Sequence, residues 1–530
     1  MCGIVFATVI EGDLDTCTEK CKNRGPDETH SLVTNNLYFG FNRLAIHDLT
    51  DAGSQPFTKH DCVLICNGEI YNHRLLNTPY ERQSQSDCEV ILDIYADMVK
   101  NRGLGISAML DVLDGEFAFV IHDIQLNRTI IARDPNGVRP LFWCVEDDVV
   151  YAASLLTCID GMSNQVTQFP PGHYSVVYHD PLNVRTYSYY NTQSLPHVRI
   201  RERDQAIVAI RWALENAVIK RLDSEREVCA LLSGGLDSSL VAAIASRYVR
   251  KQGKVLKTFS IGLARSPDTE YAEIASKFIG SDHTTVTLSE EQFLDAIAET
   301  ISVIESYDVT TVRASVGNYL LCKHISRETS CKVVLNGDYS DEVAGGYLYF
   351  KNAPDNHSFD RECHRLLRDV CFFDSLRSDR SISANGLEGR VPFADKNYVS
   401  TYLCIDAHLR NMPIEKQLLR EAFHGHAYLP DEVLWRKKEA FSDGVSQQTT
   451  SWKDIIQRYV EDKVSIEDMD NAAQRFPHNT PDTKEAYLYR TLFASKFAND
   501  KAIPYKWMPK WVDPSIKDPS ARSLHMYDAE

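Results

Sequence analysis

The second residue of the chain is a cysteine, which lies directly after the initiator methionine in the opening run MCGIV. If Met1 is removed, Cys2 carries a free α-amine and a thiol on one residue. Such an amine can take the thiol proton while the sulfur attacks a carbonyl carbon, as in N-terminal threonine nucleophiles. The alternative is that Cys2 has no chemical role, because single cysteines are usually inert. The rest of the sequence must decide between these two interpretations.

A glycine-rich segment forms the second group of residues with chemical potential. The run LLSGGLDSS spans residues 231–239, between an apolar strand-like stretch and a helical pattern. A strand–loop–helix of this kind directs backbone N–H groups and a helix N-terminus at one point, where phosphates bind. No lysine follows the glycines, so this is not the GxxxxGK[ST] loop. A glycine turn capped by Ser233 or Asp237 is the competing interpretation.

An acidic loop follows a second apolar stretch, in VVLNGDYSDEVAGGY at residues 333–347. It contains Asp338, Asp341 and Glu342. Carboxylates at the carboxyl ends of parallel strands lie where such sheets bind ligands, and they suit Mg²⁺. A solvated acidic turn would be favoured for this loop alone. Together with the glycine loop on the same expected sheet, the functional interpretation is favoured.

The elements that must position these residues differ between the two halves. The first 190 residues or so contain short strand-like runs separated by turns, with a helical stretch at residues 87–100. They predict layered strands and helices. Residues 185–203 are polar and predict a linker. Strand and helix patterns then alternate, which predicts a parallel sheet covered on both faces, and helical patterns dominate after about residue 360. The expected fold is a two-domain α/β protein with domains at 1–190 and 204–530.

Composition limits the partners. The net charge is −17 over 530 residues, which argues against non-specific binding to nucleic acid or to anionic membranes. No apolar run is long enough to cross a bilayer, and no secretory signal pattern is present. Fourteen scattered cysteines fit a reducing compartment. We expect a cytoplasmic protein with small-molecule substrates, and a homodimer stays open.

Short motifs of the first half occur in the order found in class II glutamine amidotransferases. They are RGPD (24–27), NRLAIHD (42–48), CNGEIYN (66–72), SDCEV (86–90), LDGEFAF (113–119) and ARDPNGVRPLFW (132–143). With SGGLDSS, DVTTVRAS, SISANGLEGRVPF and RKKEAFSDGV, the chain resembles the glutamine-hydrolysing asparagine synthetases up to about residue 450. The resemblance implies an N-terminal-nucleophile domain followed by an ATP-pyrophosphatase-type synthetase domain.

For the first domain, the resemblance implies hydrolysis of glutamine to glutamate and ammonia. Cys2 would be the nucleophile, and Asn67 and Gly68 would supply the oxyanion donors. Arg43 would bind the carboxylate of glutamine, while Glu69 and Asp87 would bind its ammonium. The residues expected to bind glutamine are Arg43, Leu44, Ala45, Ile46, His47, Asn67, Gly68, Glu69 and Asp87.

For the second domain, the resemblance implies activation of aspartate by ATP as β-aspartyl-AMP, which ammonia converts to asparagine, AMP and pyrophosphate. Asp338 would act in catalysis, and Asp237 and Asp341 would hold Mg²⁺. ATP, a substrate, would contact Leu232, Ser233, Gly234, Gly235, Asp237, Ser238, Ile261, Asn336, Gly337 and Lys438. Lys438 would stabilise the pyrophosphate. Aspartate would contact Thr310, Arg313 and Glu342.

Two positions depart from the family pattern. The family usually has SGEGSDE where this chain has NGDYSDE at residues 336–342, so Asp338 replaces a glutamate. Leu155 also stands where a glutamate is common. A related amidotransferase or a β-lactam-type synthetase acting on another carboxylate is therefore an alternative, as is a glutamine- or nucleotide-sensing protein. Retention of Cys2, Asp237 and Asp341 favours the asparagine synthetase interpretation.

Overall fold

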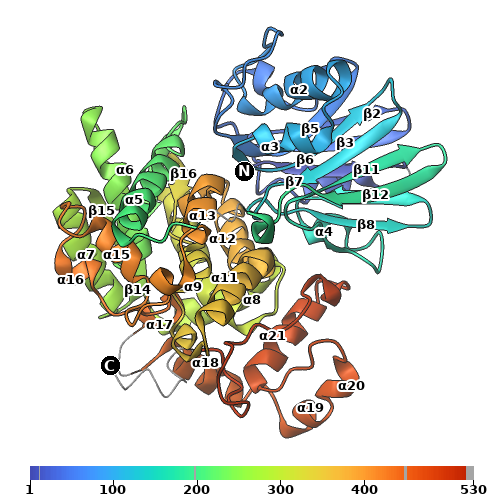
Figure 1. Ribbon diagram of the computed structural model, residues 1–530. Coiled ribbons are helices and arrows are strands. Elements are labelled where there is room, and N and C mark those ends of the chain that lie inside the picture. Colours follow the sequence, from blue (N-terminus) through green and yellow to red (C-terminus); the bar gives the residue numbers. More distant parts are fainter. Residues whose placement is uncertain (11, 196–198, 447–449, 521–530) are drawn as a thin grey trace. The chain divides into compact units, whose positions relative to one another are not determined.

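The structure is a computed structural model that describes residues 1–10, 12–195, 199–446 and 450–520. The chain forms two compact units (Figure 1). The first contains Met1–Ser194 together with Asp223–Glu227 and Ser383–Glu388, and the second contains Leu195–Leu222, Val228–Ile382 and Gly389–Glu530. Two short segments from beyond residue 204 therefore belong to the first unit, which no local sequence pattern predicted.

Two six-stranded sheets make up the first unit, and their recorded strand pairs are antiparallel. One has the order β10 (Thr167–Gln168), β8 (Phe142–Glu146), β9 (Val149–Ala153), β1 (Gly3–Ala7), β3 (Leu37–Arg43), β2 (Glu28–Thr34). The other has the order β12 (Leu182–Ser188), β11 (His173–His179), β7 (Arg128–Arg133), β6 (Gly115–Asp123), β5 (Cys62–Ile70), β4 (Phe57–Lys59).

The side chains of β5 explain the layering of this unit. Val63 and Ile65 pack with Phe6 of β1 and other residues of the first sheet, so they fill the core between the sheets. The alternate residues, Leu64 and Cys66, join a second core beneath helices. Successive strand residues point to opposite faces, so a continuous apolar run such as CVLIC fits a strand that is buried on both faces.

Helices cover the outer faces of this pair of sheets. The helical stretch predicted at 87–100 is confirmed in three consecutive pieces: η2 (Asp87–Glu89), α2 (Val90–Ile94) and the π-helical η3 (Tyr95–Asn101). Residues of α2 and of α3 (Ile106–Val112) belong to the second core. On the other side, α1 (Leu14–Glu19) contacts β1 and β3, and α4 (Leu156–Ile159) contacts β9. The unit is thus a helix–sheet–sheet–helix sandwich.

A five-stranded sheet forms the centre of the second unit, in the order β15 (Asp282–Leu288), β14 (Lys257–Leu263), β13 (Glu227–Leu231), β16 (Cys331–Leu335), β17 (Glu388–Arg390). The β13–β14 and β14–β15 pairs are parallel, as the alternation of strands and helices predicted. The helices that connect or flank these strands are α5 (Arg203–Lys220), α6 (Leu236–Lys251), α7 (Pro267–Ile279), α8 (Glu290–Ile304) and α9 (Val309–Glu328).

Helices dominate the rest of the second unit, as predicted. They are α10 (Ser340–Ala344), α11 (Asn356–Asp369), α12 (Asp374–Ser383), α13 (Lys396–Leu403), α14 (Ala407–Arg410), α15 (Gln417–Phe423), α16 (Asp431–Leu434), α17 (Phe441–Gly444), α18 (Trp452–Glu461), α19 (Ile466–Asp470), α20 (Ala472–Arg475) and α21 (Lys484–Ala494). In Figure 1, α18 to α21 form the last part of the described chain. The predicted fold class is confirmed.

The sequence predicted a linker between the two domains and no membrane-spanning segment. The predicted linker at 185–203 is correct only in part, because residues 185–188 belong to β12 and pair with β11. The rest runs from the end of β12 to the start of α5, and residues 196–198 of it lie outside the described residues. Within the part of the chain that the structure describes, no helix is long and apolar enough to span a membrane.

Candidate active sites

Cys2 lies immediately before β1, where its Sγ is 3.9 Å from the carbonyl oxygen of Leu44. The side chain keeps partial access to solvent. Desolvation by the surrounding protein raises the pKa of the Cys2 thiol to about 11, although the nearby terminal ammonium of Met1 lowers it. Met1 itself is buried, with its ammonium 3.7 Å from Oε2 of Glu388. A thiol with so high a pKa needs an adjacent base before it can attack.

Asn67 lies on β5 and is completely buried. Neither its side-chain nitrogen nor its side-chain oxygen has a hydrogen-bond partner among the described residues. Buried polar groups are nearly always paired, so an unpaired amide in a core is best explained by a ligand that completes it. The predicted oxyanion donor thus has an amide N–H group free to donate.

Gly68 follows Asn67 on the same strand, opposite Phe117 of β6. A Cβ atom at Gly68 would lie 2.6 Å from the carbonyl oxygen of Glu116 and 2.8 Å from the Cα of Phe117. Because real Cβ atoms do not approach backbone so closely, only glycine lets β5 and β6 pair here. The NGE motif therefore has a structural reason for its glycine in addition to the predicted catalytic one.

Glu69 and Asp87 form a buried carboxylate pair. Asp87 accepts a hydrogen bond from the backbone N–H of Ile70 at 2.6 Å. Burial, and then the charge of Glu69, raise the pKa of Asp87 to about 7. The Nε2 atom of His47 lies 3.3 Å from Oε2 of Glu69. Two neighbouring carboxylates in a low-dielectric setting favour a cation between them, and the ammonium of an amino acid fits that requirement.

Arg43 ends β3 and is almost fully buried. One guanidinium nitrogen donates to Oε1 of Glu28 at 3.0 Å and to the carbonyl of Thr50 at 2.9 Å, and the other donates to the carbonyl of Asp48. Arg43 therefore holds the ends of the loop that contains Leu44, Ala45, Ile46 and His47. Its predicted contact with the carboxylate of glutamine stays a prediction.

Two residues that the sequence did not single out hold the same loop. The side chain of Arg226 donates to the carbonyl of Ala45 at 2.9 Å, and the carboxylate of Glu225 accepts from the backbone N–H of Asp48 at 3.0 Å. Both belong to Asp223–Glu227, one of the segments added to the first unit. No local pattern marks them, because their partners lie some 180 residues earlier in the chain.

A cavity of about 180 Å³ lies at the carboxyl ends of the strands in the second unit. It gathers most of the predicted synthetase residues, namely Leu232, Ser233, Gly235, Asp237, Ser238, Ile261, Thr310, Asn336, Gly337, Asp338, Asp341, Glu342 and Lys438. Gly234 and Arg313 are the predicted residues that do not line it. Lining residues that the sequence did not identify include Asp374, Arg377, Lys416 and Arg436.

The glycines of the two loops are required by close backbone approach. Gly234 has φ +72°, and a Cβ there would lie 2.5 Å from the backbone nitrogen of Ala272 in α7. A Cβ at Gly337 would lie 2.6 Å from the backbone nitrogen of Ser238. The two loops therefore pack against each other at the N-terminus of the 16-residue helix α6, which can bind phosphate.

Asp237 and Asp341 meet at one lysine. The Nζ atom of Lys416 lies 2.6 Å from Oδ2 of Asp237 and 2.6 Å from Oδ1 of Asp341, and Nζ of Lys438 lies 2.7 Å from Oδ2 of Asp341. Burial alone would raise the pKa of Asp341, but the charges of Lys416 and Lys438 overcome it and hold that pKa well below its usual range. Two carboxylates and two ammonium groups are thus collected in one pocket.

Asp237 and Asp341 are the candidate ligands for Mg²⁺ in this cluster. The described residues contain no group of three or more histidine, cysteine or acidic side chains arranged for a metal. Mg²⁺ is often held by only one or two carboxylates, with phosphate and water oxygens completing its six ligands. The Asp237–Asp341 pair fits that role in the presence of a substrate phosphate.

Asp338 is held by an arginine. One terminal nitrogen of Arg377 lies 2.8 Å from Oδ1 of Asp338, and its Nε lies 2.6 Å from Oδ1 of Asp374. Next to them, burial and the charge of Asp374 raise the pKa of Glu342 well above its usual value. Burial and the charge of Asp374 therefore favour the protonated form of Glu342, which can donate a hydrogen bond. Tyr339 adopts φ 73°, which places a non-glycine residue in the left-handed region beside Asp338.

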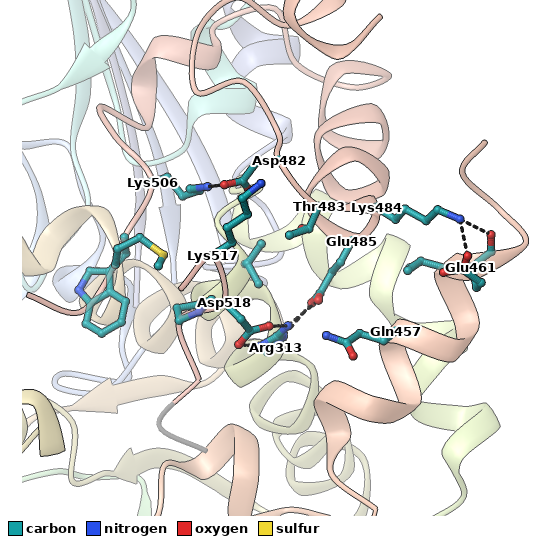
Figure 2. Close-up of a pocket in the computed structure, with 15 residues that line it drawn as sticks. Arg313, Gln457, Glu461, Asp482, Thr483, Lys484, Glu485, Lys506, Lys517 and Asp518 are labelled. Atoms are coloured by element: carbon teal, nitrogen blue, oxygen red, sulfur yellow. Dashed lines mark hydrogen bonds and ion pairs between the residues drawn. The ribbon is translucent and has the colours of Figure 1, made fainter. Parts of the chain in front are cut away.

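Thr310 and Arg313 face different pockets, although both lie on α9. The hydroxyl of Thr310 lines the cavity and has no partner among the described residues. Arg313 instead lies in a second pocket, where its Nε is 2.8 Å from Glu485 (Figure 2). This differs from the prediction that both contact aspartate. The reason is the packing around α9, because Arg313 pairs with Glu485 of α21 and with Asp518, which hold its side chain in the second pocket.

Comparisons with known proteins agree with the two-part organisation. A family model described as a glutamine amidotransferase domain matches residues 1–168, and one described as asparagine synthase matches residues 209–358 and 351–514. The chain thus joins an amidotransferase domain to a synthetase domain.

Similarity to curated proteins extends over the whole length. An asparagine synthetase (glutamine-hydrolyzing) of Homo sapiens is 39% identical over 568 residues, covering 99% of each chain. The protein of that name from Gallus gallus is 39% identical over 542 residues, covering 96% of this chain and 95% of its own. The chain belongs to the family of glutamine-hydrolysing asparagine synthetases, as the motifs predicted. Among solved structures, a glutamine phosphoribosylpyrophosphate amidotransferase from B. subtilis covers 55% of this chain and 91% of its own, at 16% identity and a TM-score of only 0.31.

Proposed function

We propose that the chain makes asparagine from aspartate and ATP, using ammonia that it releases from glutamine. The observation that carries the proposal is the coexistence of two separately built sites. One has an N-terminal thiol with an unpaired buried amide at Asn67, and the other has a phosphate-binding loop with paired carboxylates and lysines. We assign glutamine hydrolysis to residues 1–190 and the synthetase reaction to residues 204–530.

In the proposed glutaminase step, removal of Met1 frees the α-amine of Cys2, which takes the thiol proton as the sulfur attacks the amide carbon of glutamine. Asn67 and Gly68 donate hydrogen bonds to the oxyanion that forms. The protonated amine returns its proton to the departing ammonia, and water then hydrolyses the thioester to glutamate. Glu69 and Asp87 hold the substrate ammonium throughout, and Arg43, which orders the loop beside it, binds the substrate carboxylate.

In the proposed synthetase step, an oxygen of the aspartate β-carboxylate attacks the α-phosphorus of ATP, and pyrophosphate leaves. The loop at residues 233–238 binds phosphate through its N–H groups, while Lys416 and Lys438 neutralise the departing charge. Asp237 and Asp341 would hold Mg²⁺, which supplies further neutralisation of the pyrophosphate when bound. Ammonia then attacks the β-carbonyl carbon of β-aspartyl-AMP, and AMP leaves.

The aspartate subsite is assigned to the far end of the same cavity. The unpaired hydroxyl of Thr310 can donate a hydrogen bond to a carboxylate there, and so can Glu342 in its protonated form, which burial and the charge of Asp374 favour by raising its pKa. Arg377, which lines this cavity and pairs with Asp338, supplies the positive charge that a dicarboxylate needs, in place of Arg313, which lies outside the cavity. Asp338, held by Arg377, lies where it can accept a proton from attacking ammonia.

The test is the identity of the nucleotide product. Purified protein is incubated with ATP, Mg²⁺, glutamine and aspartate, and AMP, ADP, asparagine and glutamate are quantified, with aspartate omitted as the control. We expect equal amounts of AMP and asparagine, with no AMP when aspartate is absent. ADP as the product would contradict the proposal. AMP without asparagine would indicate another acceptor, and no turnover would indicate a sensing protein.

The proposal also covers the partners and the location of the protein. The substrates are glutamine, aspartate and ATP, with no nucleic acid or membrane partner. A cytoplasmic location is supported by the cysteines, because all fourteen lie within the described residues and are free thiols. We propose a homodimer as well. Light scattering on the purified protein tests it, and a mass near 60.1 kDa, which is that of one chain, would contradict it.

A further inference from the structure

A second cavity of the synthetase unit has no role in the reaction described above. Its volume is about 240 Å³. It is bounded by the start of α9, the end of α18, the start of α21 and the segment 506–519 (Figure 2). With about 30 Å³ for each molecule of liquid water, the space corresponds to roughly eight waters, which suits a small metabolite.

The floor of this pocket is rich in hydrogen-bond acceptors. Arg313 lies between two carboxylates, with Glu485 on one side and Asp518 on the other, at 2.9 Å from Oδ2 of Asp518. Arg313 and Glu485 are each only 4% exposed. Lys453 approaches Asp518 from outside the pocket at 3.6 Å. Each carboxylate oxygen has a second lone pair, so the floor can accept further hydrogen bonds from an ammonium group.

The mouth of the pocket carries cationic groups. Lys506 lies 2.6 Å from Oδ2 of Asp482, and Lys484 lies 2.6 Å from Oε1 of Glu461. Figure 2 shows Lys517 reaching toward the same end as Lys506. No ion pair or hydrogen bond of the Lys517 side chain is recorded within the described part of the chain. Lys506 is thus paired with Asp482, while among the described residues the Lys517 ammonium at the same end is available to an anion.

Apolar side chains form a third part of the lining, namely Val309, Val460, Trp507, Met508 and Pro519. A molecule with an ammonium group, a carboxylate and an apolar substituent would contact all three parts at once. That combination defines a free α-amino acid with an apolar side chain, which is chemically distinct from glutamine and aspartate.

Two contacts join this pocket to the synthetase cavity. The backbone N–H of Trp507 donates to Oδ2 of Asp308 at 3.0 Å, and Asp308 is the N-cap of α9. The ring of Trp507 lies 5.6 Å from the ring of Tyr347, which lines the synthetase cavity. A ligand that fixes Trp507 therefore acts on the start of the helix that carries Thr310.

We propose that the pocket formed by Arg313, Glu485, Lys506, Trp507 and Lys517 binds a free α-amino acid with an apolar side chain and that this ligand alters aspartate binding in the neighbouring cavity. The ammonium contacts Glu485 and Asp518, the carboxylate contacts Lys506 and Lys517, and the side chain packs on Trp507. The binding of the amino acid, which is the binding half of this proposal, does not depend on the proposed function. The effect on aspartate binding, which is the regulatory half, rests on the proposed function.

Calorimetric titration of the full-length protein with L-leucine, L-methionine and L-phenylalanine, without ATP or other substrates, tests the binding. We expect saturable binding of at least one of them. The Lys506→Met/Lys517→Met double variant should bind it at least tenfold more weakly. The matched control, Lys496→Met/Lys501→Met, loses the same charge at exposed lysines outside the pocket and should bind like the unchanged protein. Lys517→Glu, at an exposed position, repeats the test should the double variant fail to fold.

Analogues separate the two charged contacts. L-leucinol lacks the carboxylate and 4-methylpentanoate lacks the ammonium, so each should bind at least tenfold more weakly than L-leucine. The binding half is overturned if none of the three amino acids binds up to its solubility limit. It is equally overturned if binding is unchanged in both the double variant and Lys517→Glu.

The regulatory half is measured by ammonia-dependent synthesis. The KM for aspartate should change when the bound amino acid is saturating, in the unchanged protein and in the control variant but not in the Lys506→Met/Lys517→Met variant. An aspartate KM that is the same with and without the ligand would overturn this half. Failure of the proposed function is recognised separately, because no asparagine would then form even without the ligand.

Discussion

The glutaminase site and the synthetase site treat buried carboxylates in opposite ways. At the first, Asp87 faces Glu69, and its pKa rises to about 7. At the second, Asp341 faces Lys416 and Lys438, and its pKa falls well below the usual range. Both carboxylates are buried, so burial cannot explain the difference. The sign of the nearest charge decides it.

This contrast indicates what each site requires from its substrate. On the proposed function, the carboxylate pair and the unpaired amide at Asn67 in the first site would be completed by the ammonium and the amide oxygen of glutamine. The second site contains Lys416 and Lys438 beside its carboxylates, and these lysines would meet the charge of the pyrophosphate.

Replacement of Cys2 by alanine should have the largest effect and separate the two sites completely. Glutamine-dependent synthesis should fall by at least about 10⁴-fold, because removal of a covalent nucleophile abolishes the chemical step. Synthesis from added ammonium salts should be unchanged, since only the first site contains the thiol. Asparagine production is measured with each nitrogen source.

Two outcomes would contradict the division between the sites. One is loss of ammonia-dependent synthesis in a Cys2→Ala variant whose melting temperature is unchanged. The other concerns the proposed α-amine base: mass spectrometry of fully active protein that finds Met1 still attached would exclude it. Cys17→Ala, at a buried cysteine of α1, is the control and should keep both activities.

Asp237→Asn should affect only the synthetase site, by on the order of 10²–10³-fold in AMP formation, the range seen for loss of one electrostatic contact in an active site. The change removes one negative charge beside Lys416 while keeping the shape of the side chain. Glutaminase activity should be unaffected. Asp295→Asn, at an exposed position of α8, is the matched control. An unchanged rate of AMP formation would mean that Asp237 only caps the loop.

Local patterns predicted the elements and the residues that lie on them. The SGGLDS loop, the acidic loop after β16 and the NGE motif on β5 are marked by glycines and acidic residues within a few positions of one another. Lys416 was missed because it meets Asp237 and Asp341 across many residues of sequence. Arg377 was missed because Asp338, its partner in the cavity, lies 39 residues away, although Asp374 is close in sequence. Lysines and arginines are usually solvated, so nothing local distinguishes these two.

The same limit explains Arg313 and the segment Asp223–Glu227. Arg313 belongs to a recognised motif, but the direction in which a helix faces depends on what packs against α9, here α21 and the segment near Asp518. The contacts of Glu225 and Arg226 with the loop at residues 44–48 depend on the path of the chain. Neither follows from spacing along the sequence.

Asp338→Ala tests whether the departure from the family pattern still leaves a working group in the synthetase site. Asparagine formation should fall on the order of a hundredfold with either nitrogen source, the scale of a positioning error near 1 Å. Glutaminase activity should survive. Loss of the carboxylate also leaves Arg377 with Asp374 as its remaining partner. A fully active variant would remove Asp338 from the site.

Asp338→Glu restores the usual family residue and should not raise the rate appreciably. Tyr339 is 1% exposed and adopts φ 73°, so the loop shape beside it is set by a bulky side chain rather than by a small one. A longer carboxylate must then share the space with Tyr339. Ammonia-dependent asparagine and AMP production decide the point, and a much faster Asp338→Glu enzyme would show that nothing compensates for the shorter aspartate.

The smallest effect should be a pH dependence confined to the glutaminase site. Asp87 binds the substrate ammonium only when ionised, and its pKa of about 7 lies above that of an ordinary aspartate. The carboxylate is therefore protonated as the pH falls below 7, and the KM for glutamine should rise by up to about tenfold per pH unit there and level off above 7.

Steady-state glutaminase assays between pH 5.5 and 8.5 separate this change in KM from the pH dependence of kcat, which follows the thiol and the amine. In Asp87→Asn the KM should be high and independent of pH, whereas Asp148→Asn, in the exposed turn between β8 and β9, should keep the original profile. A KM that rises with increasing pH would mean that the protonated form of Asp87 binds glutamine, and the contrast between the two sites would then lie in hydrogen bonding rather than in charge.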